Sequence, residues 1–190
     1  MDSEKVAKFM ALAGQIVETK FTTGTETQRK LGAQLLLSEV LEYVIKGLGV
    51  TPEINGVKIT DADALHYHAE REPNQTEMLD GLADVAYTMY WNSNCFGLPL
   101  EPAYDLVCDN NLEKFVRIGE WARGKKELQK SEWDCKKNIT WPPEVAQVSV
   151  VELQGELWAV GKDARGKVRK PGSFKSVDLS PLLYIQSDAA

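Results

Sequence analysis

The chain has 190 residues, of which 43% are hydrophobic and 26% are charged, so it can form both a hydrophobic core and a soluble surface. Its 22 basic and 28 acidic residues give a formal net charge of −6, which argues against sequence-independent binding to DNA or RNA. Three cysteines without CxxC spacing argue against a disulfide scaffold. The first residues do not resemble a signal peptide, and no stretch approaches the ~18 apolar residues that cross a bilayer. We therefore expect a cytoplasmic protein without membrane contacts.

Helical periodicity dominates the first two-thirds of the chain. Apolar residues recur every three or four positions at 3–20 and again at about 27–46, which predicts two amphipathic helices. Residues 50–73 predict a long connection of the kind that is often functional.

Two further helices are predicted after this connection. Asn74 followed by Glu77 resembles a capping box and predicts a third helix at 75–95. Pro102 suits the first turn of a fourth helix, which we expect to continue past Phe115.

The character of the sequence changes after residue 134. The alternating segment 148–161 turns around Gly155 and predicts a β-hairpin, and a basic, turn-rich segment follows it. The predicted fold is therefore all-α. It has a four-helix-bundle-like core at 1–135 and a small appendage at 136–190, in which the hairpin and the basic segment pack on the core.

Two groups of acidic residues lie inside apolar helical segments. Glu39 and Glu42 are three residues apart, and at about 100° per residue they share one helix face. Asp80 and Asp84 are four apart, and Glu77 lies three residues before Asp80 on the same face. Such pairs repel each other by a few tenths of a kcal/mol on an exposed helix. Burying them without a partner costs far more, so a divalent cation is the simple candidate for offsetting the repulsion.

Carboxylates from two facing helices would form an oxygen-rich site, which suits Mg²⁺ or Mn²⁺ better than Zn²⁺. A pair such as Glu39 and Glu42 is also common on the solvated edge of a helix. The spacing alone leaves a metal site and a solvated edge about equally open.

The same segments resemble a known family. LLLSEVLEYVIKG, then DGLADVAYTMYW, then the Asn-x-x-Lys spacing of Asn111 and Lys114 are together similar to the MazG-like all-α nucleoside triphosphate pyrophosphohydrolases. That family is marked by E-E-x-x-E on one helix and E-x-x-D on the next. The resemblance covers roughly residues 5–117 and 160–185. It implies Mg²⁺-dependent conversion of a (d)NTP to (d)NMP and pyrophosphate for nucleotide-pool control, in a homo-oligomer that is a dimer or a tetramer.

The resemblance also implies roles for individual residues. The metal ligands would be Glu39, Glu42, Asp80 and Asp84, and Glu39 or Glu42 would orient or deprotonate the attacking water. A triphosphate is repelled by bare carboxylates, whereas Mg²⁺ reverses that field, binds phosphate oxygens and lowers the pKa of a bound water.

Four residues would contact the phosphates on this hypothesis. Asn111 and Lys114 would do so from the fourth helix, and Lys167 and Lys170 from the basic GKVRKP segment. The ordinary alternative for each lysine is a solvated surface position.

The chain departs from the family pattern at two positions. Ser38 occupies the place of the first Glu of E-E-x-x-E. The acid before Asp84 lies at Asp80 instead of at Gly81, with Glu77 as a candidate substitute. Two alternatives therefore stay open: a phosphoribosyl-ATP pyrophosphohydrolase, and a non-catalytic helical module that binds nucleotides or regulates, which Ser38 makes conceivable.

Overall fold

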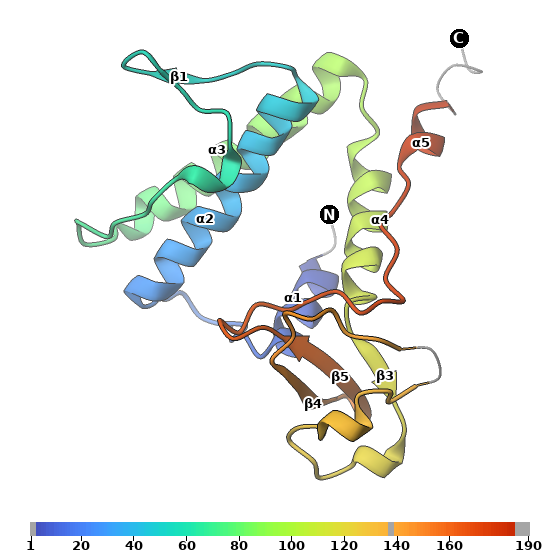
Figure 1. The fold of residues 1–190 in the computed structure, drawn as a ribbon. Coiled ribbons are helices and arrows are strands. Elements are labelled where there is room, and N and C mark those ends of the chain that lie inside the picture. The colour runs from blue at the N-terminus through green and yellow to red at the C-terminus, as the bar shows by residue number, and fades with distance from the viewer. Residues whose placement is uncertain (1–2, 137–138, 185–190) are drawn as a thin grey trace. The chain divides into compact units, whose positions relative to one another are not determined.

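The computed structural model describes residues 3–136 and 139–184 (Figure 1). The chain divides into two compact units. The smaller unit is the continuous segment Lys20–Tyr87, and the larger unit combines Met1–Thr19 with Thr88–Ala190. Helix α3, Gln75–Phe96, runs across the boundary between them. Every helix in the described ranges is too short or too polar to span a bilayer.

The prediction of an all-α, four-helix-bundle-like fold is wrong, because the chain forms two small antiparallel sheets in addition to its helices. The predicted fourth helix ends at Leu112, and the chain enters a strand at Val116. Val116 and Ile118 are buried while Arg117 between them is exposed. That period of two suits a half-buried strand and cannot form one face of a helix. The fold is therefore mixed.

Helices α1, Ser3–Ala13, and α4, Leu100–Leu112, pack together in the larger unit. The ammonium of Lys5 on α1 forms ion pairs with Asp105 and Asp109 on α4, at 2.6 and 2.8 Å. The two carboxylates are one turn apart, so a single lysine reaches both. A short helix α5, Ser180–Tyr184, lies at the C-terminal end of the described chain.

The larger unit also contains a three-stranded antiparallel sheet in the order β3–β5–β4. Its strands are β3, Val116–Ile118, β4, Gln147–Leu153, and β5, Glu156–Lys162. Strands β4 and β5 form the hairpin predicted around Gly155, which is confirmed. Gln154 and Gly155 have φ values of 53° and 79°, as the central residues of a two-residue type I′ turn require.

Strand β5 contributes to both hydrophobic clusters of the larger unit. Leu157 and Ala159 belong to one cluster, and Val160, with Trp158 packed beside it, belongs to the other. Successive side chains of a strand point to opposite faces, so one strand can supply both clusters. The first cluster also contains Val116, Ile118, Ala122, Leu128, Ile139, Val145 and Val148, and the second contains Leu12, Ala13 and Phe115.

Two further contacts tie the sheet to its surroundings. The ammonium of Lys162 donates a hydrogen bond of 2.9 Å to the carbonyl oxygen of Ala13, one of the last carbonyls of α1. A cation at this end of a helix also complements the helix dipole. Phe9 of α1 packs edge-on against Phe115, with ring centroids 5.0 Å apart.

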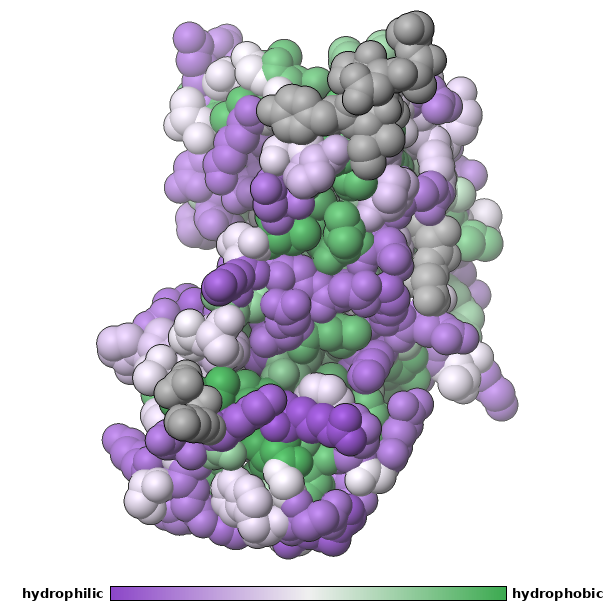
Figure 2. All heavy atoms as spheres, turned by 90° about the vertical axis from the view of Figure 1, so that its right-hand side faces the viewer, coloured by the Kyte–Doolittle hydropathy of each residue, from purple (hydrophilic) through white to green (hydrophobic). Residues whose placement is uncertain are grey.

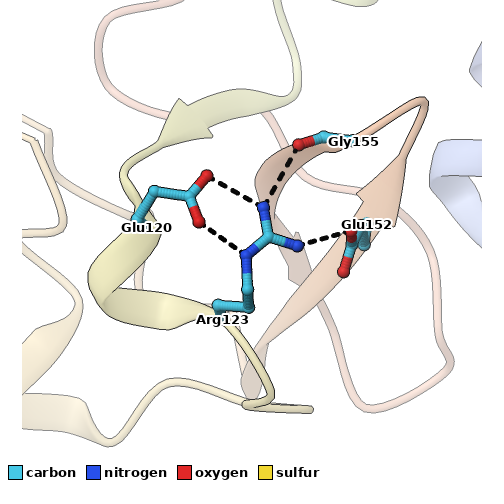
Figure 3. Close-up of polar contacts among 4 residues, drawn as sticks. All are labelled: Glu120, Arg123, Glu152 and Gly155. Atoms are coloured by element: carbon cyan, nitrogen blue, oxygen red, sulfur yellow. Dashed lines mark hydrogen bonds and ion pairs between the residues drawn. The ribbon is translucent and has the colours of Figure 1, made fainter.

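Arg123 connects the segment after β3 to the β4–β5 hairpin (Figure 3). Its guanidinium donates two hydrogen bonds to Glu120, at 2.5 and 2.9 Å, and one to Glu152 at 2.6 Å. It also donates to the carbonyl of Gly155 at 3.4 Å. The hydrogen bonds from Arg123 hold the pKa of Glu120 below its usual range. Because the charged groups are exposed, this network contributes little to stability. Its effect is to hold the segment after β3 against the β4–β5 hairpin.

Two 3₁₀ turns, Glu120–Ala122 and Lys130–Glu132, lie between β3 and β4. Residue Leu128, which precedes the second turn, donates its backbone N–H to the carbonyl of Val148 on β4. The segment between the turns thereby covers part of the outer edge of β4, which limits edge-to-edge pairing with another chain.

In the smaller unit, helix α2, Glu26–Glu42, begins at a capping box. The hydroxyl of Thr25 accepts a hydrogen bond from the backbone N–H of Gln28, and the Gln28 side chain accepts one from the backbone N–H of Thr25. The helix continues into a π-helical turn, Tyr43–Gly47. At the start of α3, the Asn74 side chain accepts a hydrogen bond of 3.0 Å from the N–H of Thr76 and so acts as the cap.

The predicted connection between α2 and α3 contains a small hairpin. Strand β1, Glu53–Ile54, pairs antiparallel with β2, Val57–Lys58, and a 3₁₀ turn, Ala62–Ala64, follows. Asn55 and Gly56 form the turn with φ values of 51° and 80°. Asn-Gly is the dipeptide that most strongly favours such a turn.

The smaller unit has almost no interior. Neither α2 nor α3 has a buried residue, and Ala62 alone is buried among the residues described from 20 to 87. The large apolar side chains of this unit that are more than a third exposed are Phe21, Leu31, Leu35, Leu36, Leu37, Val40, Leu48, Val50, Ile54, Val57, Met78, Leu79, Leu82 and Tyr87. Apolar side chains also reach the surface on the face of the molecule drawn in Figure 2. Large exposed apolar patches on a protein usually mark interaction surfaces, so these helices are candidates for one.

Gly161 provides a test of the packing around β5. A Cβ at this position would lie 2.4 Å from a ring carbon of Trp141. We expect Gly161→Ala to lower the free energy of unfolding by about 1–3 kcal/mol, the usual cost of overpacking, as measured by denaturant unfolding. In a Trp141→Leu background the same substitution should cost less, because the blocking ring is gone. An equal cost in both backgrounds would contradict the steric explanation.

Candidate functional site

Glu39 and Glu42 lie on the last turns of α2, and both side chains are exposed. Glu42 accepts a hydrogen bond of 2.9 Å from the ammonium of Lys46, one turn further along. This bond raises the pKa of Lys46, and the charges of Asp63 and Asp61 add to the effect. An exposed pair of this kind contributes at most a fraction of a kcal/mol, so it constrains Glu42 only weakly.

A pocket of about 130 Å³ lies beside Glu42. It is lined by Glu42, Ile45 and Lys46 from the end of α2 and the π-helical turn, and by Thr60, Asp61, Ala62 and Asp63 from the segment around the 3₁₀ turn. Asp61 also accepts a hydrogen bond of 2.9 Å from the N–H of Asp63, which fixes the start of that turn. Asp61 and Asp63 were not predicted as site residues, because a segment without periodicity does not indicate which side chains it brings to a neighbouring helix.

Asp80 and Asp84 lie on α3 and are also exposed. Their neighbours Leu79 and Leu82 are 73% and 61% exposed, so the carboxylates lie among uncovered apolar side chains. The helix was predicted to carry both acids on one face, and four residues correspond to about one turn. Each helix of the smaller unit thus combines a pair of acids with apolar surface.

The described residues do not assemble a metal site within one chain. No group of three His, Cys, Asp or Glu side chains in the ranges 3–136 and 139–184 is placed so that it could hold a metal ion. Glu39, Glu42, Asp80 and Asp84 therefore do not fit a cation as one chain presents them. Ser38, which stands where the family pattern has Glu, donates its hydroxyl to the carbonyl of Leu35 at 3.2 Å and so turns back onto its own helix.

Asn111 and Lys114 are brought together in the larger unit. The ammonium of Lys114 donates a hydrogen bond of 2.7 Å to the side-chain oxygen of Asn111 and lies 5.5 Å from the ring centroid of Phe9. Both residues are partly buried at the end of α4, so the cation is held in a defined place. Lys170 lies over the ring of Phe174, at 4.6 Å from its centroid, and is otherwise exposed.

Asp163 organises the turn that carries Lys167. Its carboxylate accepts hydrogen bonds of 2.9 Å from the N–H groups of Arg165 and Lys167, and one of 2.6 Å from the Arg169 guanidinium. Burial works to raise the pKa of Asp163, but the bonds from Lys167, Arg169 and Arg165 outweigh it and hold that pKa below its usual range. Only the basic residues of this segment were predicted to have a role, and Asp163, which positions them, was not predicted.

The chain matches no protein-family model, no curated protein and no solved structure. The candidate functional residues are therefore identified from this chain alone, in each unit separately. The smaller unit has two pairs of carboxylates, on α2 and α3. The larger unit has the Asn111–Lys114 pair and the basic turn.

We expect Asp163→Asn to loosen the turn that carries Lys167. The hydrogen exchange of the Arg165 and Lys167 amides should become faster, as measured by mass spectrometry, because their acceptor loses its charge. A carboxylate with a lowered folded pKa stabilises fully above its unfolded value, about pH 4, and this contribution disappears as the pH falls through the folded value. The stability difference between wild type and Asp163→Asn should therefore vanish in acid.

Glu144→Gln is the control for this prediction, because Glu144 is an exposed acid of the same unit. Glu144→Gln should leave the hydrogen-exchange rates of the Arg165 and Lys167 amides unchanged. It should also leave the pH dependence of stability unchanged. If the two variants have the same pH dependence, the Asp163 carboxylate does not hold the turn.

Proposed function

We propose that this protein is a MazG-like nucleoside triphosphate pyrophosphohydrolase of the cytoplasm, which converts a (d)NTP to (d)NMP and pyrophosphate and requires Mg²⁺ or Mn²⁺. The observation that supports this proposal is the pairing of carboxylates on both helices of one compact unit, Glu39 with Glu42 on α2 and Asp80 with Asp84 on α3. Like charges one turn apart destabilise a helix, so two such pairs in one unit favour a ligand that offsets them.

The proposed active form is a homo-oligomer, a dimer or a tetramer. The apolar side chains left exposed on α2 and α3 support this part of the proposal. A stable interface needs about 800 Å² from each partner, and hydrophobic burial is its main driving force. Because the described residues of one chain do not assemble the carboxylates into a cation site, the proposed cation requirement is that of the assembled protein.

The proposed phosphate contacts lie in the larger unit. Lys114, which Asn111 holds in place, supplies a partly buried cation, and Lys167 and Lys170 supply exposed ones. Cations bind phosphate oxygens through charge-assisted hydrogen bonds, which are about twice as strong as neutral ones. Their contribution is to binding and orientation of the substrate.

A non-catalytic nucleotide-binding or regulatory module is the second candidate. The Ser38 hydroxyl, which is bonded to its own helix, supports it, as does the engagement of Glu42 with Lys46. A measurement of turnover separates the two candidates. Phosphoribosyl-ATP, assayed beside the dNTPs, tests the related phosphoribosyl-ATP pyrophosphohydrolase activity.

The product pattern tests the proposed reaction. With Mg²⁺ we expect dNTP to give dNMP and intact pyrophosphate, separated by chromatography without added pyrophosphatase, and EDTA should stop the reaction. Asp84→Asn should abolish turnover, whereas Glu70→Gln, which changes an exposed acid in the same unit, should not. Orthophosphate and dNDP as first products would overturn the assignment, and binding without turnover would favour the non-catalytic module.

Metal binding provides a second, independent test. Mg²⁺ or Mn²⁺ should raise the melting temperature of the wild type by mass action, by an amount equivalent to about 2.7 kcal/mol at a hundredfold excess over Kd. Glu42→Gln should weaken this response while the protein keeps its helical circular dichroism.

Glu26→Gln is the matched control for Glu42→Gln. Glu26 pairs with Lys30 at 2.8 Å on the same helix, as Glu42 pairs with Lys46, but it belongs to no predicted metal site. It should leave the metal response intact. An equal response in both variants would exclude Glu42 as a ligand.

A further inference from the structure

The turn of the β1–β2 hairpin contains a dipeptide that occurs once in the chain. Among the asparagines of the sequence, Asn55 alone is followed by a glycine. Both residues are exposed, and with φ values of 51° and 80° they form the turn between the strands. The backbone nitrogen that follows an asparagine is a nucleophile within reach of its side-chain carbonyl. Glycine presents this nitrogen with the least steric hindrance, because it has no Cβ.

The surroundings of Gly56 leave its backbone nitrogen accessible. A Cβ placed on Gly56 would have no described atom within 4 Å apart from its chain neighbours, so the backbone borders open space. The hydrogen bond of a β-turn joins its first and fourth residues, here Ile54 and Val57, and so does not use the Gly56 N–H. The turn itself therefore does not engage the attacking group.

The attack also requires the backbone between Asn55 and Gly56 to rotate out of the turn. Each strand of the hairpin has two residues, and a hydrogen bond of 2.8 Å from the Ile59 N–H to the Pro52 carbonyl closes it. Hairpins with two strands are at best marginally stable in water, so this one opens at a small cost in free energy. The rotation is therefore accessible in the folded protein.

Two other asparagines are held within helices and serve as references. Asn92 on α3 donates its side-chain N–H to the carbonyl of Thr88 at 2.9 Å. Asn110 on α4 donates its side-chain N–H to the carbonyl of Lys175 at 2.7 Å. Rotation of the backbone beside either residue would break hydrogen bonds of the helix, so both side chains are protected from this attack.

We propose that Asn55 is a site of spontaneous deamidation. The Gly56 nitrogen attacks the side-chain carbonyl carbon of Asn55 and forms a new N–C bond. The bond from that carbon to the side-chain nitrogen breaks, and ammonia leaves with the proton of the Gly56 N–H. Water then opens the succinimide ring. Opening at the side-chain carbonyl gives aspartate, and opening at the main-chain carbonyl gives isoaspartate, so the overall reaction consumes one water and releases one ammonia.

The two products differ in their effect on the hairpin. Aspartate adds a negative charge but keeps the main chain, and Asp-Gly also favours this turn. Isoaspartate routes the main chain through the side-chain carboxyl and so inserts one more carbon, which disrupts the pairing of such short strands. The segment Thr60–Asp63, which follows the hairpin directly, lines the pocket beside Glu42. Isoaspartate at Asn55 therefore loosens one wall of that pocket. The reaction needs no ligand and no partner, and is independent of the proposed function.

Peptide mass spectrometry of the full-length protein, aged in mildly alkaline buffer, tests the reaction. Electron-transfer fragmentation distinguishes aspartate from isoaspartate. We expect Asn55 to convert at least about tenfold faster than Asn92 and Asn110 in the same sample. Gly56→Ala should slow conversion at Asn55 by at least about tenfold, because its Cβ hinders the attack, although the residue strains the turn. Conversion no faster than at Asn92, or a rate in Gly56→Ala equal to or above that of wild type, overturns the proposal.

Hydrogen exchange tests the effect on the hairpin. The Ile59 amide should lose protection in the isoaspartate form, isolated by chromatography, and keep it in Asn55→Asp, which has the added charge without the added carbon. An equally protected Ile59 amide in both proteins would exclude the opening of the hairpin. Equal loss of protection in both would show that the charge, and not the inserted carbon, opens it, which also overturns the role given to isoaspartate.

Discussion

The larger unit depends on one strand that is buried on both of its faces. Leu157 and Ala159 of β5 complete one hydrophobic cluster, and Val160 completes the other. The strand also lies between β3 and β4, so its backbone is hydrogen-bonded on both edges. The absence of a side chain at Gly161 leaves room for the Trp141 ring. The contact between Asn111 and Lys114 lies beside this packing, because Lys114 is 5.5 Å from the ring of Phe9, which packs against the cluster that contains Val160.

The smaller unit has the opposite construction. Its helices are well capped, yet their apolar side chains line the outside and no core joins them. The same helices carry carboxylates one turn apart, which favour water or a cation. Apolar side chains are stabilised by removal from water, whereas clustered carboxylates are stabilised by contact with water or a cation. The exposed apolar side chains and the clustered carboxylates of these helices therefore favour different surroundings.

Local signals in the sequence predicted most elements but not their arrangement. The four longer helices and the hairpin around Gly155 follow from periodicity and turn residues, and the structure has them. Strand β3 was missed because its evidence is not local: Arg117 pairs with Trp158, some forty positions later. The 53–58 hairpin was missed although its Asn-Gly turn signal was present.

For the candidate site, the spacing of acids and of Asn111 and Lys114 indicated which side chains share a helix face. The Glu42–Lys46 pair follows from the four-residue spacing along the helix. Asp61 and Asp63 lie beside Glu42 because a non-periodic segment folds back on α2. Spacing along one helix carries no information about such a contact.

The hydrogen bond between Lys162 and Ala13 has a consequence for the order in which the protein forms during synthesis. It joins positions 149 residues apart, and the unit to which it belongs is interrupted by the continuous segment Lys20–Tyr87. Helix α1 therefore leaves the ribosome long before the strand that caps it, and contacts this distant form late. Throughout that interval the helices of the interrupting segment are already outside, with their apolar faces uncovered.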